Sequence, residues 1–158
     1  MKKISRGRRS VLRAGSGAGV VAALAAAGFF APGEALAAWA KDAFEGKSVA
    51  DAMKAMGATA SGASGDVQIV ASDIAENGAV VPIQAISKAA NTQQIAIMVE
   101  KNPNVLAAIF DVGPDVLPDF TTRIKMGETS NVTVLVKADG KFLTATKEIK
   151  VTLGGCGG

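Results

Sequence analysis

The sequence predicts a mainly β fold, an immunoglobulin-like sandwich of about seven strands that follows a short helical segment. Three observations predict it. From Asp66 onward, apolar and polar residues alternate in short runs, which is typical of half-buried strands. Turn-forming clusters of Gly, Pro, Asn and Asp separate these runs. Before them, apolar residues between positions 38 and 56 recur at spacings of three and four, which is typical of helices.

The first element, residues 1–37, has the three-part pattern of an export signal. Its basic region holds six of the chain's 17 Lys and Arg residues, and a run rich in Ala and Gly follows over residues 14–30. Ala35 and Ala37 form the small-x-small site that signal peptidase accepts. We therefore expect cleavage after Ala37.

The arginine pair Arg8-Arg9, followed by Val, Leu and Arg, resembles the twin-arginine signal, whose pathway exports folded proteins. The general secretory pathway is the alternative route. The apolar run is shorter than about 20 strongly apolar residues and is diluted by glycine, so it does not have the pattern of a transmembrane helix. The sequence therefore predicts a soluble periplasmic protein without a stable membrane anchor.

The formal net charge of +3 belongs to the precursor. Residues 1–37 contain six basic residues and one acidic residue, and their removal leaves 11 basic and 13 acidic residues, a net charge of −2. A mature chain with this balance lacks the positive charge that binds phosphate backbones. We therefore expect no nucleic-acid partner.

Residues 38–65 form the predicted helical segment and linker. Gly46 and Ser48 divide the helical pattern, and Ser48 is a suitable N-cap for a second helix. The small and polar residues 57–65 indicate a linker or long loop. The large apolar side chains of the helical segment either dock on a partner or cap the chain's own core, and both possibilities stay open. They are Trp39, Phe44 and Met53.

Residues 66–153 form the predicted sandwich domain. The alternation predicts seven strands, near 66–71, 79–86, 93–100, 105–111, 119–125, 131–138 and 141–153. The pair Asp139-Gly140, between the last two strands, is typical of a two-residue hairpin turn. The Cys-Trp-Cys pattern of antibody domains is absent, so the prediction concerns the architecture alone.

The sequence ends in Gly-Gly-Cys-Gly-Gly, residues 154–158, which we expect to form a flexible arm. Glycine has no Cβ, so such an arm is thin and adopts most backbone angles. Fully extended, it reaches about 10 Å from Leu153 to Cys156. A single cysteine in an exported chain indicates a reactive or intermolecular thiol. The arm is suited to present Cys156 to another protein, and its glycines are Gly154, Gly155, Gly157 and Gly158.

The composition excludes most familiar catalytic and metal sites. The chain has no His, so it cannot form a Ser-His or Cys-His pair, and one Cys without His cannot supply the ligands of a zinc site. We predict no catalytic residue, no metal site and no cofactor. Alternatives to a substrate-carrying thiol are a structural or adhesive sandwich joined by a Cys156 disulfide, and a thiol enzyme such as a sulfurtransferase. A ubiquitin-like sulfur carrier with a terminal Gly-Gly would conflict with the export signal.

The tail and three internal segments resemble the SoxY family, the sulfur-carrier subunits of the bacterial Sox thiosulfate-oxidising system. In the tail, Val151-Thr152-Leu153 precedes the Gly-Gly-Cys-Gly-Gly sequence. The internal segments are residues 73–82, 99–104 and 123–130. The resemblance extends over the signal and nearly all of residues 38–158.

This resemblance implies a covalent carrier without catalytic residues or cofactors of its own. It implies a heterodimer with SoxZ. It also implies that the haem protein SoxAX attaches thiosulfate oxidatively to Cys156 of this chain, giving a cysteine S-thiosulfonate. The hydrolase SoxB would release the terminal sulfone as sulfate, and a sulfane dehydrogenase, where present, would oxidise the remaining sulfane. The haem and molybdenum of this system belong to the partners.

Overall fold

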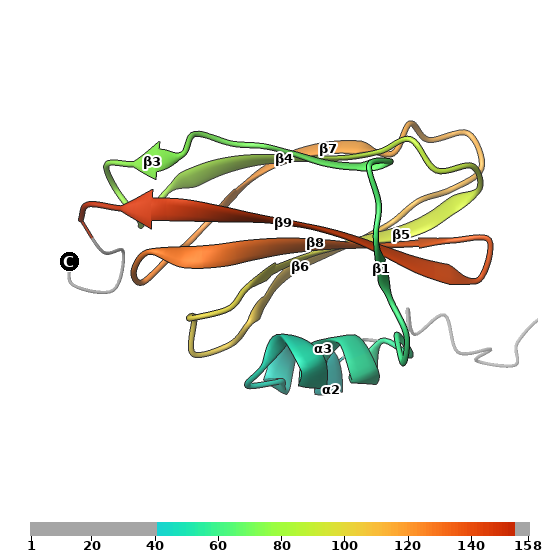
Figure 1. Ribbon diagram of the computed structural model, residues 1–158, viewed down its shortest axis with the longest axis horizontal. Helices are drawn as coiled ribbons and strands as arrows, with labels where there is room; N and C mark the ends of the chain where they lie inside the picture. Colours follow the sequence, from blue (N-terminus) through green and yellow to red (C-terminus); the bar gives the residue numbers. More distant parts are fainter. Residues whose placement is uncertain (1–40, 154–158) are drawn as a thin grey trace, which may run out of the picture. The chain divides into compact units, whose positions relative to one another are not determined.

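The computed structural model describes residues 41–153 (Figure 1). The described residues belong to one compact unit. Its helices and strands, in chain order, are α2 (Lys41–Glu45), α3 (Val49–Ala55), β1 (Gly62–Ala63), β2 (Val67–Val70), β3 (Ile74–Ala75), β4 (Val81–Ser87), β5 (Thr92–Val99), β6 (Leu106–Asp111), β7 (Asp119–Ile124), β8 (Ser130–Ala138) and β9 (Lys141–Val151).

The strands form two sheets, which confirms the predicted sandwich. The six-stranded sheet has the order β1-β9-β8-β5-β6, and β3 also pairs with β9. The three-stranded sheet has the order β2-β4-β7. Both pairings between a short strand and β9 are parallel, whereas the pairings among the seven longer strands are antiparallel. Figure 1 shows the two layers face to face, with the helices on the far side of the larger sheet.

The sandwich core is built from the alternating apolar residues that predicted the strands. Ile83 of the smaller sheet and Ile97 and Val134 of the larger one are at most 1% exposed. Strands β5 and β8 are nevertheless buried over nearly continuous runs. The reason is that the other face of these two strands, with Ala96, Met98 and Leu135, packs against the helical segment. The buried residues of that segment are Ala43, Ala52 and Ala58.

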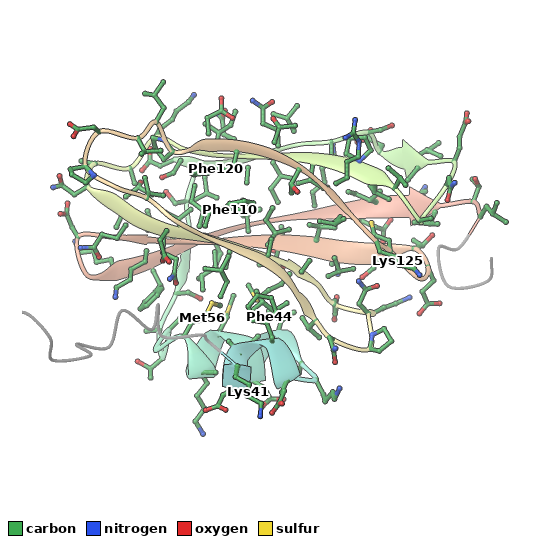
Figure 2. The ribbon with its side chains drawn as sticks, turned by 180° about the vertical axis from the view of Figure 1, so that it is seen from behind. Lys41, Phe44, Met56, Phe110, Phe120 and Lys125 are labelled. Carbon is green, nitrogen blue, oxygen red and sulfur yellow. The ribbon has the colours of Figure 1, made fainter. Side chains whose placement is uncertain are left out.

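The helical segment caps the chain's own sheet. Phe44, Met53 and Met56 pack against the outer face of the larger sheet, and Figure 2 shows Phe44 and Met56 directed toward it. The two helices are separated at Gly46, where an added Cβ would lie 3.0 Å from the backbone nitrogen of Ala52. For Phe44 and Met53 the structure therefore favours the core-capping interpretation over a free docking surface; Trp39 lies outside the described residues.

The predicted N-cap and hairpin are confirmed. The hydroxyl of Ser48 accepts a hydrogen bond from the backbone N–H of Asp51 at 3.1 Å, at the start of α3. Asp139 and Gly140 have φ angles of 47° and 71°, as a type I′ turn requires.

All seven predicted strands are present, each beginning and ending within two residues of its expected bounds. Two short strands were not predicted. Strand β1 lies in the expected linker and pairs with Leu143 and Thr144, and β3 lies between two predicted strands. The boundaries of the four predicted segments, 1–37, 38–65, 66–153 and 154–158, stay predictions.

Candidate functional site

The residues that the sequence assigns to function lie outside the described part of the chain. They are Cys156 with the glycines 154, 155, 157 and 158, the export pair Arg8 and Arg9, and the cleavage residues Ala35 and Ala37. The described chain reaches Leu153, three residues before the cysteine. The structure therefore defines the base from which the predicted arm starts, and we call residues 151–153 the arm base.

The backbone of the arm base is held by β3 and the turn that follows it. Strand β3 pairs in parallel with the end of β9, with Ala75 opposite Val151. The N–H of Thr152 donates to the carbonyl of Ala75 at 3.1 Å. The N–H of Gly78 donates to the carbonyl of Leu153 at 2.7 Å. Backbone hydrogen bonds thus continue to the last described residue. Figure 1 shows β3 beside the end of β9.

Two threonine side chains complete this anchorage. The hydroxyl of Thr129, in the loop before β8, accepts a hydrogen bond from the N–H of Val151 at 2.9 Å. The hydroxyl of Thr152 donates to the carbonyl of Glu76 at 3.0 Å. Each residue of the arm base therefore bonds to a segment distant in sequence. We call the residues that hold it, Ala75, Glu76, Gly78 and Thr129, the arm clamp.

The turn that carries Gly78 is itself fixed from two sides. The side chain of Asn77 accepts a hydrogen bond from the N–H of Ala79 at 2.8 Å, which forms a local turn. The carbonyl of Gly78 accepts from the N–H of Met126 at 2.7 Å. The next loop is held by Asn102, whose side chain donates to the carbonyl of Lys125 at 2.7 Å. Figure 2 shows Lys125 at the end of the sandwich where β9 ends.

A lysine clasp fixes the segment that leads into β3. The ammonium of Lys147 on β9 donates to the carbonyl of Ala71 and lies 2.8 Å from the carboxylate of Asp73. The hydrogen bond and the positive charge of Lys147 lower the pKa of Asp73, and the charge of Lys150 acts in the same direction. The backbone carbonyl of Asp73 also accepts from the N–H of Lys150 at 2.9 Å. The clasp joins the entry of β3 to β9.

The described residues provide an anchor and show no catalytic constellation. The chain contains neither His nor Tyr. Within residues 41–153, no group of three His, Cys, Asp or Glu residues is placed to hold a metal ion. None of the helices in this range has the length and apolar character needed to cross a membrane.

Sequence reasoning missed the arm clamp and the lysine clasp. The pair Asn77-Gly78 is typical of a turn, but nothing local indicates that this turn bonds to Leu153. The contact between Thr129 and Val151 spans 22 residues, and that between Thr152 and Glu76 spans 76. Such contacts follow from the sheet topology, and a local pattern does not contain them.

Comparisons with known proteins agree on one family. The family model described as "Sulfur oxidation protein SoxY" matches residues 52–156. The solved structure of the sulfur carrier protein SoxY from Chlorobium limicola f thiosulfatophilum is similar, with 36% sequence identity and a TM-score of 0.62, covering 72% of this chain and 99% of that one. No curated protein matches the chain.

A second solved structure is much less similar. It is the superoxide reductase (neelaredoxin) from Ignicoccus hospitalis, with 15% identity and a TM-score of 0.48 over 54% of this chain and 79% of the other. A likeness at this level carries no argument.

Proposed function

Because the chain belongs to the SoxY family, whose members are sulfur carriers of thiosulfate oxidation rather than catalytic enzymes, we propose that Cys156 is its point of covalent sulfur attachment. The observation that carries this proposal is the position of the cysteine. It is the chain's one thiol, the family match extends to it, and it follows a firmly bonded arm base by three residues. Because the chain has a single cysteine, this thiol has no partner within the chain for a disulfide.

The carrier chemistry needs nothing from this chain except the thiol. The thiolate and thiosulfate lose two electrons together and form a new S–S bond, giving Cys–S–S–SO₃⁻. In the proposed system the electrons pass to the haem protein SoxAX. Water then cleaves the S–SO₃⁻ bond on the hydrolase SoxB, releasing sulfate and two protons and leaving Cys–S–S⁻. A sulfane dehydrogenase, where present, oxidises the remaining sulfur.

The proposed place of action is the periplasm. The Arg8-Arg9 pair and the Ala35–Ala37 site support export by the twin-arginine route. That route carries folded proteins, so a SoxZ partner without its own signal would be exported with this chain. Replacing Arg8 and Arg9 with lysine is expected to retain the unprocessed precursor in the cytoplasm, and cell fractionation with N-terminal sequencing measures this. Normal export of that variant would contradict the twin-arginine assignment.

A cysteine-relocation experiment tests the attachment site. The wild-type chain, Cys156→Ser, and the double variant Cys156→Ser/Leu117→Cys are expressed in thiosulfate-grown cells, and each is examined by intact mass. Leu117 is 82% exposed on the loop between β6 and β7, so the double variant has an accessible thiol away from the arm. We expect sulfur adducts on the wild-type chain alone.

The other outcomes separate the competing functions. Adducts on the relocated thiol would show that any exposed cysteine is loaded and that the arm has no special role. A wild-type chain that carries no sulfur adduct and is isolated as a Cys156-linked dimer would favour the structural or adhesive alternative. The Leu117→Cys substitution changes an exposed residue outside both core clusters, so we expect the double variant to fold as Cys156→Ser does.

A further inference from the structure

The arm clamp determines where the chain leaves the sandwich. The antiparallel ladder between β8 and β9 ends at the pair Ser130–Ile149. Beyond it, the arm base depends on β3, Thr129 and the turn at Gly78. Without these contacts, the last residue of β9 held by a backbone hydrogen bond would be Lys150, whose N–H donates to the carbonyl of Asp73.

This difference changes the distance that Cys156 can reach. From Leu153 the thiol is three residues away, an extended span of about 10 Å; from Lys150 it would be six residues away, a span of about 20 Å. The local concentration of a tethered group falls roughly as the −3/2 power of tether length. Releasing the whole arm base would therefore dilute the thiol about threefold around a docked partner.

The arm clamp acts on exposed residues, where it adds little to the core. Thr152 is exposed and Leu153 is 66% exposed, so neither buries much apolar surface. Thr152 nevertheless makes two hydrogen bonds, one through its N–H and one through its hydroxyl. Each such bond adds modest net stability, and the two together hold a local segment in place.

We propose that Thr152 is a positioning residue that sets the working length of the arm. It fixes the pivot at Leu153, so that Cys156 enters a partner enzyme from a constant distance. This inference rests on the proposed role of Cys156. Thr152 lies outside the core, and its proposed role is to help the arm clamp set the number of free residues between the sandwich and Cys156.

The test is a double-mutant cycle that combines a substitution at Thr152, which releases the pivot, with a deletion in the arm, which shortens it. The first variant, Thr152→Pro, removes both hydrogen bonds of Thr152. The second deletes Gly155 and shortens the reach by about 3.4 Å. Sulfate release from the thiosulfonate-loaded full chain, in complex with its partner subunit, is measured with the partner hydrolase. Reduction of the same adducts by dithiothreitol reports the intrinsic reactivity of the cargo.

In the wild-type background, we expect deletion of Gly155 to lower kcat/KM at least tenfold. In the Thr152→Pro background the same deletion should have little effect, because the released chain restores the lost length. Thr152→Pro alone should lower kcat/KM about twofold, because Val151 stays bonded to Thr129 and the tether lengthens from three residues to five. Dithiothreitol reduction should be unchanged in all variants, and Thr152→Ser, which keeps both bonds, should match wild type.

Two results would overturn the inference. Equal effects of the Gly155 deletion in both backgrounds would show that Thr152 does not set arm length. Unchanged amide exchange at Gly78 in Thr152→Pro and in a second variant, Thr152→Val/Thr129→Val, would show that the arm base stays closed without these bonds. Absence of any adduct on the wild-type chain would instead overturn the proposed function, and this inference with it.

Discussion

The two ends of strand β9 are held in opposite ways. At its start, Asp139 and Gly140 form a two-residue turn that joins β8 directly to β9, with φ angles of 47° and 71°. At its end, the arm base bonds to Ala75, Gly78 and Thr129, which belong to two separate segments, β3 with its following turn and the loop before β8. The first end depends on local turn chemistry, and the second depends on the completed fold.

The two ends therefore have different roles: the hairpin end supports the stability of the domain, and the arm end positions the arm base. A turn that closes the β8–β9 hairpin supports the longest ladder of the larger sheet, so its loss affects the whole domain. The arm base contributes few buried contacts, so its loss should open a local segment and leave the domain folded. Substitutions along β9 can therefore show where the effect changes from unfolding of the whole domain to opening of a local segment.

The largest effect on the free energy of unfolding is expected at Ile149, where the β8–β9 ladder ends and the arm base begins soon after. Its side chain is fully buried in the sandwich core at the last pair of the β8–β9 ladder. We expect Ile149→Ala to lower the free energy of unfolding by about 3 kcal/mol, because it removes buried methylenes and leaves a cavity. Denaturant unfolding measures this. A loss below about 1 kcal/mol would mean that the core already ends before this residue.

A smaller global effect is expected at the hairpin end. Gly140 has a φ of +71°, so Gly140→Ala should cost about 1–2 kcal/mol through backbone strain alone, since an added Cβ would meet open space. Gly65→Ala is the matched control, because an added Cβ there also meets open space and its backbone is not in the left-handed region. Equal unfolding midpoints for the two variants would contradict the role of the turn.

At the arm end, the expected effect is local. Thr129→Val removes the acceptor of the Val151 N–H and should increase amide exchange at Val151 about fivefold, equivalent to about 1 kcal/mol of local opening. The global unfolding free energy should change much less. Thr122→Val, the same change at a half-buried position of β7, is the control. A fully global loss in Thr129→Val would remove the distinction between the two ends.

The smallest effect concerns the lysine clasp and pH. Lys147 lowers the pKa of Asp73 in the folded protein, so the clasp stabilises the fold at pH values above the ordinary Asp value of 3.8. This stabilisation should be lost as the pH falls through the lowered pKa. The Asp73→Asn variant should lose that part of the acid dependence, whereas Asp115→Asn should keep it. Thermal unfolding between pH 5 and pH 2 measures both, and identical profiles would contradict the role of the clasp.

The sequence was sufficient where structure depends on neighbouring residues. Alternation of apolar residues located the seven longer strands, Ser48 marked the start of α3, and Asp139-Gly140 marked the hairpin. It was insufficient for β1 and β3, which have two residues each and no period to detect. Both depend on pairing with β9, as the arm clamp does. The single cysteine is evident from the composition, whereas the hydrogen bonds that hold the arm base follow from the topology.

The proposal for Cys156 is tested most directly by intact mass spectrometry of the protein purified without reductant from thiosulfate-grown cells. We expect the mass of residues 38–158 with added sulfane or thiosulfonate, located on the peptide that contains Cys156. This result would demonstrate both processing after Ala37 and cargo on the arm. A processed chain with an unmodified thiol, or one isolated as a Cys156-linked homodimer alone, would contradict a carrier function.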